Sequence, residues 1–152
     1  MPSDISAIKR LTRNDVSWIS PGSKSHQAGI NLPLRSFRSM FISLIQNEEE
    51  NAPRQAFQTV WYTSDGELIV ESSCQVVRYH SKNELRLVNI PKNNLAQHLE
   101  EEHYLFIRRD QGILHISVLE FDPTHLMQEF EQVSVLENRS DIMSGRLTKL
   151  PH

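Results

Sequence analysis

The chain has 152 residues, of which 38% are hydrophobic and 23% charged, and this size and balance suit one folded domain with a single core. Its only cysteine, Cys74, excludes an internal disulfide, and because the sequence has neither a secretory leader nor an apolar run of roughly 18 residues, we expect a cytoplasmic protein with no membrane partner. The net charge of −3 disfavours indiscriminate binding to nucleic acid.

The N-terminal region predicts two strands separated by a long loop. The strands are expected at residues 5–11 and 27–32, the second ended by Pro33. Residues 12–27 between them are rich in Asn, Asp, Pro, Gly and Ser, which favour turns over regular structure. Loops of this length in a compact domain are usually functional or disordered, so we take this one as a candidate binding arm.

A helix is expected next, because apolar residues recur at helical spacing from Leu34 to Ile45. Pro33 suits the first turn of such a helix, and Arg35, Arg38 and Ser39 fall on its polar side. The helix would close one end of a sheet.

The rest of the chain predicts short strands joined by turns, with hairpin signals at Ser64-Asp65-Gly66 and Asp110-Gln111-Gly112. Strands are expected at residues 57–62, 67–71, 74–79, 84–90, 103–109 and 113–120. A short helix capped by Asn94 is expected to run to about Glu102, and an amphipathic helix at residues 124–133 precedes a polar tail. Seven or eight short strands with few helices indicate a mainly β fold with an antiparallel, barrel-like sheet.

Positive charge is concentrated in two parts of the chain. Residues 1–40 hold six Lys or Arg against two Asp, and residues 72–92 hold four against one Glu, whereas the remaining segments are acidic. Since the local field decides where a phosphate backbone docks, these two parts are candidates for contact with DNA. Ordinary solvated faces are the alternative reading of the charge pattern alone.

Residues 82–87 have the pattern of a strand that could read bases. In a strand, Lys82, Glu84 and Arg86 would share one face, while Leu85 and Leu87 would enter the core. Arginine can donate twice to guanine, and a carboxylate can accept from cytosine N4, both in the major groove. The pattern therefore predicts recognition of G·C pairs; an exposed ladder of charges is the alternative.

The loop at residues 12–27 carries hydrogen-bonding groups suited to phosphates and base edges, in the run Ser23-Lys24-Ser25-His26-Gln27. Trp18, earlier in the loop, would either cover the edge of the core or contact a sugar or base. An ordinary surface loop is the alternative.

Motifs for catalysis are weak. The seven histidines lack the spacing of a zinc site, and the sequence has no glycine-rich phosphate loop and no nucleophile elbow. We therefore expect a binding domain that is not itself an enzyme and that needs no cofactor to bind.

Three short pieces resemble a known family, the N-terminal effector DNA-binding domain of EcoRII-type restriction endonucleases, a bacterial relative of the plant B3 domain. They are Ile8-Lys9-Arg10-Leu11-Thr12-Arg13-Asn14-Asp15, then His26-Gln27-Ala28-Gly29-Ile30-Asn31-Leu32-Pro33, then Val76-Val77-Arg78-Tyr79 leading to Lys82-Asn83-Glu84-Leu85-Arg86-Leu87. The likeness spans roughly residues 5–120.

The resemblance implies a seven-stranded open pseudobarrel with two helices, whose N-arm and C-arm enter the major groove and bind 5′-CCWGG-3′, where W is A or T. It places contact positions of the family on His26 and Asn31 in the N-arm, and on Lys82, Glu84 and Arg86 in the C-arm. The chain departs from the family in a longer N-arm loop, and in Asn31, Lys82 and Leu85, which stand where the family has an aromatic residue, an arginine and a basic residue.

Together these readings predict a sequence-specific effector domain of a two-site restriction endonuclease, formed by residues 1–122. Residues 123–152 are expected to form a C-terminal helix and a linker towards the catalytic nuclease domain of the same polypeptide, for which alone Mg²⁺ is expected. The isolated domain would be monomeric and bind double-stranded DNA. The expected DNA contacts are Arg13, Asn14, Trp18, Ser23, Lys24, Ser25, His26, Gln27, Asn31, Lys82, Asn83, Glu84 and Arg86.

Arg13, Lys24 and Lys82 are expected to contact phosphates, while His26, Asn31, Glu84 and Arg86 are expected to specify bases. Three alternatives stay open: a B3-like domain of different sequence specificity, a protein-interaction β-barrel whose arms are idle loops, and a small stand-alone nuclease.

Overall fold

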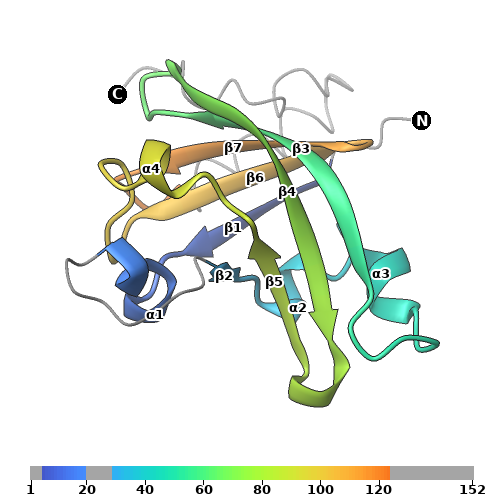
Figure 1. Cartoon of the computed structure of the whole chain (residues 1–152). Coiled ribbons are helices and arrows are strands. Elements are labelled where there is room, and N and C mark those ends of the chain that lie inside the picture. Colours follow the sequence, from blue (N-terminus) through green and yellow to red (C-terminus); the bar gives the residue numbers. More distant parts are fainter. Residues whose placement is uncertain (1–4, 20–28, 124–152) are drawn as a thin grey trace.

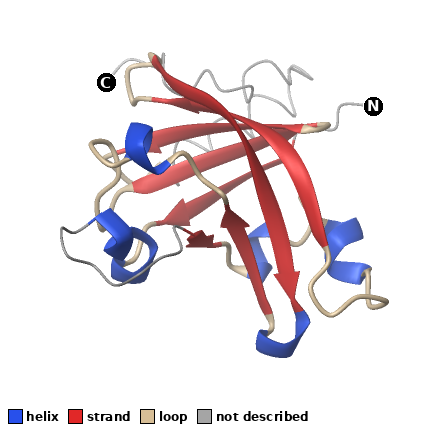
Figure 2. Ribbon diagram, viewed as in Figure 1, coloured by secondary structure: helices blue, strands red, loops and turns tan. Residues whose placement is uncertain are grey.

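Seven strands form one sheet that curls into a half-barrel (Figures 1 and 2). The computed structural model describes residues 5–19 and 29–123. The strands are β1 (Ile5–Arg10), β2 (Gly29–Asn31), β3 (Arg54–Tyr62), β4 (Leu68–Tyr79), β5 (Glu84–Val88), β6 (Tyr104–Asp110) and β7 (Ile113–Leu119). Their order across the sheet is β1-β6-β7-β3-β4-β5-β2, and the neighbours are antiparallel except β3 and β7, which are parallel. The predicted mainly β fold and open pseudobarrel are confirmed, although the sheet is mixed and not wholly antiparallel.

Four short α-helices accompany the sheet in the described part of the chain, where two were expected for this region. They are α1 (Arg13–Val16), α2 (Leu34–Phe37), α3 (Ile42–Gln46) and α4 (Lys92–Leu95). Among the described residues, no helix is both long enough and apolar enough to cross a membrane. The helix expected at residues 124–133 lies outside the described residues.

The core lies on the inner face of the curled sheet and includes the fully buried Trp61. Its indole nitrogen donates to Thr59 Oγ1 at 2.9 Å, and Thr59 Oγ1 donates in turn to the Ser72 carbonyl at 2.9 Å and lies 3.2 Å from Cys74 Sγ. The Trp61 and Thr59 donors of this buried network both have acceptors, so their burial leaves neither without a hydrogen bond. The network also links β3 to β4 and so helps to fix their register.

Cys74 should react with thiol reagents only when the barrel opens. It is fully buried, and burial raises the pKa of its thiol, although hydrogen bonds with Thr59 and Ser72 act in the opposite direction. Because the thiolate is the reactive form, we expect Ellman's reagent to modify the native protein roughly 10³-fold or more slowly than the urea-unfolded chain. Equal rates in the two states would contradict a closed β3–β4 pair.

The single helix expected at residues 34–45 is wrong, because α2 and α3 are separate. Phe41 breaks the helix with φ −126° and ψ 37°. Arg109, from β6, donates to the Met40 carbonyl at 2.6 Å, and its guanidinium carbon lies 5.9 Å and 4.9 Å from the ring centres of Phe41 and Phe57. In a continuous helix the Met40 carbonyl would accept a hydrogen bond from the backbone four residues later; here it accepts one from Arg109. Partial burial lowers the pKa of Arg109.

Two other expectations are corrected. The strands predicted at residues 67–71 and 74–79 are one strand, β4, because Ser72 and Ser73 pair with Thr59 and Gln58 of β3 and the ladder continues through them. The helix predicted from Asn94 begins instead at Lys92, after Pro91, and ends at Leu95. Proline at this position supplies a fixed φ and needs no donor, so it starts the helix earlier than an asparagine cap would.

Candidate nucleic-acid interface

One buried carboxylate holds the base of the N-terminal arm. Asp15 accepts hydrogen bonds from the Thr12 backbone at 2.8 Å, from the Thr12 hydroxyl at 2.9 Å and from the Asn31 backbone at 3.0 Å. Its Oδ2 also lies 3.1 Å from Lys9 Nζ, and the two side chains are only 2% and 5% exposed. Asp15 therefore ties β1, α1 and β2 together at one point.

The sequence interpretation of residues 12–27 as plain loop is wrong for its first part, where α1 and a 3-10 turn at Ser17–Ile19 form. The spacing Thr12-x-x-Asp15 is a capping box with Asp in the third helical position, and this signal could have been read from the sequence. Lys9 is buried and paired with Asp15, so it does not contribute to the positive surface. Arg10 is likewise engaged, with Glu102 at 3.1 Å.

The side chains of the arm that follow this base differ in their availability to a ligand. Arg13 and Asn14 are exposed on α1. Trp18 donates its indole hydrogen to the Asp15 carbonyl at 2.6 Å and packs, partly buried, against the core. Of the two roles considered for Trp18, cover of the core edge agrees with this position. Ser23, Lys24, Ser25, His26 and Gln27 lie outside the described residues, so their roles stay predictions.

The tip of the C-terminal arm is the turn between β4 and β5, which projects at the lower end of the barrel (Figure 1). Residues His80–Lys82 form a 3-10 turn, and Asn83 follows in the left-handed conformation, with φ 53° and ψ 46°. Asparagine tolerates this conformation better than most residues, which lets the chain reverse here. The expectation that Lys82 shares a strand face with Glu84 and Arg86 is therefore wrong; Lys82 is exposed at the tip.

This turn is braced from inside the barrel. Arg78, which is 8% exposed, donates to Asn83 Oδ1 at 2.8 Å and to the Glu84 carbonyl at 3.4 Å. His80 donates through Nε2 to the Asn47 carbonyl at 2.6 Å. The bond from Arg78 uses one of the two lone pairs of the Asn83 amide oxygen and orients the side chain, whose NH₂ group can still donate to a ligand.

The predicted alternation of β5 is confirmed. Leu85 and Leu87 are fully buried, whereas Glu84 and Arg86 lie on the opposite, partly exposed face. Arg86 Nε is buried and donates no hydrogen bond within the described part of the chain, which leaves its terminal nitrogens as the groups that can reach outward.

Strand pairing brings the two arms together. β2 lies antiparallel to β5, with Asn31 directly opposite Arg86, and the Leu32 backbone donates to the Leu85 carbonyl at 2.8 Å. Directly opposite residues on neighbouring strands share a face, with their Cβ atoms about 4.5–5.5 Å apart. Two residues predicted separately as contacts, one from each arm, therefore lie side by side.

The same row of the sheet contains a residue that sequence reasoning missed. Arg54, Val77, Arg86 and Asn31 are consecutive cross-strand partners on β3, β4, β5 and β2. Val77 is fully buried, and it lies in this row between the two arginines. Arg54 also donates to Gln75 Oε1 at 3.2 Å. Because Arg54 lies in an acidic stretch of the sequence, the charge pattern did not single it out. Its place in this row follows only from the register of β3 on β4.

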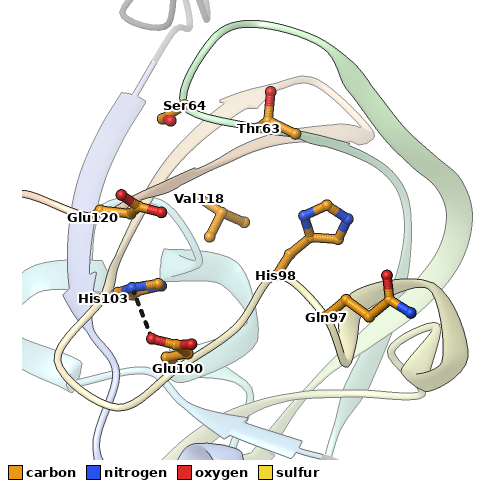
Figure 3. A pocket seen from close by; sticks show the side chains of 8 residues that line it. All are labelled: Thr63, Ser64, Gln97, His98, Glu100, His103, Val118 and Glu120. Carbon is orange, nitrogen blue, oxygen red and sulfur yellow. Dashed lines mark ion pairs between the residues drawn. The ribbon is translucent and has the colours of Figure 1, made fainter.

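A small polar hollow lies away from the arms, beside the β3–β4 turn (Figure 3). Its volume is ≈ 130 Å³, and it is lined by Thr63, Ser64, Gln97, His98, Glu100, His103, Val118 and Glu120. His103 Nε2 lies 3.4 Å from Glu100 Oε2. Among the described residues, no group of three or more His, Cys, Asp or Glu side chains is arranged to hold a metal ion.

Comparison with protein-family models finds no family that matches the chain, and comparison with curated proteins finds no match to its sequence.

Proposed function

We propose that this chain is a sequence-selective, B3-like DNA-binding module, of the kind that serves as the effector domain of a two-site restriction endonuclease, with 5′-CCWGG-3′ as its target. The observation that carries the proposal is the pairing of Asn31 with Arg86. Because β2 follows the N-arm and β5 belongs to the C-arm, one docking surface would receive the proposed base-reading groups from both arms.

The groups on this surface divide into two kinds of contact. Lys82 at the exposed tip, Arg13 on α1 and Arg54 on β3 are cations at its margins, suited to phosphates. Arg86 would donate to guanine O6 and N7, and Glu84, two residues away on the same strand face, would accept from cytosine N4. That spacing of about 6.6 Å is close to two base-pair steps, so both side chains could read one strand of the duplex.

Binding to defined duplexes tests the proposal. Fluorescence anisotropy would compare a duplex containing 5′-CCWGG-3′ with a scrambled duplex of equal composition, at one fixed salt concentration. We expect the cognate duplex to bind about 10³-fold more tightly or better. Selection from a random pool would identify a different motif if the domain reads another site. Failure to bind any duplex at low salt would favour a protein-interaction barrel, and plasmid cleavage with Mg²⁺ would favour a nuclease.

Lys82 is expected to act as a phosphate contact without sequence preference. Lys82→Gln should weaken cognate and scrambled duplexes by the same factor and should reduce the slope of log K against log[salt] by about 1. The matched control is Lys92→Gln, an exposed lysine on α4, which should leave the slope unchanged. A loss confined to the cognate duplex would instead assign Lys82 to base recognition. The measurement is a salt titration of binding for both duplexes.

A further inference from the structure

The polar hollow drawn in Figure 3 forms where three parts of the chain meet. The turn between β3 and β4 contributes residues 63–64, the segment 97–103 between α4 and β6 contributes four side chains, and the end of β7 contributes Val118 and Glu120. None of these residues belongs to the surface proposed to bind DNA, so a ligand in the hollow would be a separate one.

The lining of the hollow favours a flat cation. Glu100 and Glu120 bring two carboxylates, and the described residues that line the hollow include neither lysine nor arginine. In Figure 3, Glu100, Glu120 and His103 lie on one side of Val118, and His98 lies on the other. A ligand between them would meet carboxylate oxygens on one side and a flat imidazole ring on the other.

His103 adds an unsatisfied ring nitrogen to this lining. Its Nε2 lies 3.4 Å from Glu100 Oε2, and its Nδ1 is buried without a hydrogen-bond partner within the described residues. When Nε2 carries the hydrogen that faces Glu100, Nδ1 is left as an acceptor. A buried acceptor without a donor is unfavourable, so a ligand rich in N–H groups would complement this residue.

The walls of the hollow are held in place by backbone hydrogen bonds. The His103 backbone donates to the Glu100 carbonyl at 3.1 Å, and the Leu11 backbone donates to the His103 carbonyl at 2.8 Å. Across the hollow, the Thr63 backbone donates to the Glu67 carbonyl at 2.8 Å. Because the walls are already ordered, a ligand would not have to meet the entropic cost of ordering them.

We propose that this hollow binds a guanidinium group, carried either by a small molecule or by an arginine side chain. A guanidinium is planar and always charged, and its rigid fork of N–H donors matches carboxylate oxygens, whereas an ammonium is a compact and strongly hydrated point charge. The volume of ≈ 130 Å³ suits a group of this size, since a cavity of about 150 Å³ admits benzene.

Titration of the ¹⁵N-labelled full chain with methylguanidinium, followed by NMR at constant pH and ionic strength, tests the proposal. We expect saturable shifts of the Ser64, His103 and Glu120 amide signals, with a Kd on the order of 1–10 mM for so small a ligand. Shifts that are absent, or that rise without saturation, would overturn the proposal. Equal affinity for methylammonium would also overturn it, because the hollow would then attract any small cation.

Charge-neutral variants then locate the binding. Glu100→Gln and Glu120→Gln keep the size of each side chain but remove its charge, so each should raise the Kd at least about threefold. Glu101→Gln is the matched control, because Glu101 is exposed beside Glu100 but does not line the hollow, and its Kd should stay unchanged within error. An equal loss in Glu101→Gln would show general attraction to an acidic segment and overturn the proposal.

A blocked arginine, N-acetylarginine methylamide, distinguishes the two sources of the guanidinium group. Binding as tight as that of methylguanidinium would show that the hollow admits an arginine side chain attached to a peptide. Clearly weaker binding would assign the hollow to a free guanidinium compound.

Discussion

Replacing Asp15 with alanine should cost about 3–5 kcal/mol of folding free energy, because it leaves the Lys9 ammonium buried without its counter-charge. The same change removes the acceptor for the Thr12 hydroxyl and for the backbone of Thr12 and Asn31. Urea unfolding followed by circular dichroism would measure the loss, with the slope m as a check that the transition stays two-state.

A double-mutant cycle separates the ion pair from the packing around it. Lys9→Met should also be strongly destabilising, since it leaves the Asp15 carboxylate buried alone, whereas Lys9→Met combined with Asp15→Leu should recover part of the loss. The control is Arg10→Gln, which breaks the Arg10–Glu102 pair; those side chains are 59% and 71% exposed, so its cost should stay below about 1 kcal/mol. Equal costs for the buried and exposed pairs would refute the assigned role of Asp15.

Arg86→Gln should cost about 1–3 kcal/mol on the cognate duplex and should relax discrimination at one G·C pair. The reason is that its face of β5 and its neighbour Asn31 place the guanidinium on the surface shared by both arms. Binding would be measured on the cognate duplex and on duplexes with each base pair replaced in turn. On a duplex in which the contacted G·C pair has already been replaced, Arg86→Gln should cause no further loss of binding free energy.

Arg54→Gln is the matched control for Arg86→Gln, because the two arginines flank Val77 in one row of the sheet. Arg54 is proposed to contact a phosphate, whereas Arg86 is proposed to contact a guanine. Loss of a phosphate contact at Arg54 should weaken all duplexes by a similar factor. If Arg86→Gln also weakens cognate and scrambled duplexes equally, then Arg86 contacts the backbone and the proposed base reading is wrong.

Strands such as β5 could be predicted because their side chains alternate between the core and a partly exposed face. Leu85 and Leu87 of β5 show this alternation, and turn sequences such as Asp110-Gln111-Gly112 separate β6 from β7. The break between α2 and α3 could not be predicted, since Arg109, which binds the Met40 carbonyl, lies 69 residues further along the chain. Local patterns carry no information about such a partner.

The candidate site shows the same division between local and distant information. Glu84 and Arg86 follow from the strand pattern, and the base of the N-arm could have been found from Thr12 and Asp15. Arg54 could not, because its place beside Arg86 depends on the order and register of three strands. The left-handed turn at Asn83, which moves Lys82 out of the strand, requires knowledge of the backbone that a side-chain pattern does not supply.

The pairing of β1 with β6 also affects how the protein folds during its synthesis. Ile5 pairs with Arg109, so the first strand meets its partner only after about a hundred further residues have been made. Until then, β1 has no neighbour in the sheet, although α1, which follows it, is already joined to β2 through Asp15. Contacts this far apart in sequence slow folding, and an unpaired strand exposed on the ribosome is prone to aggregation. Chaperone dependence during translation should therefore fall sharply once β6 emerges from the exit tunnel.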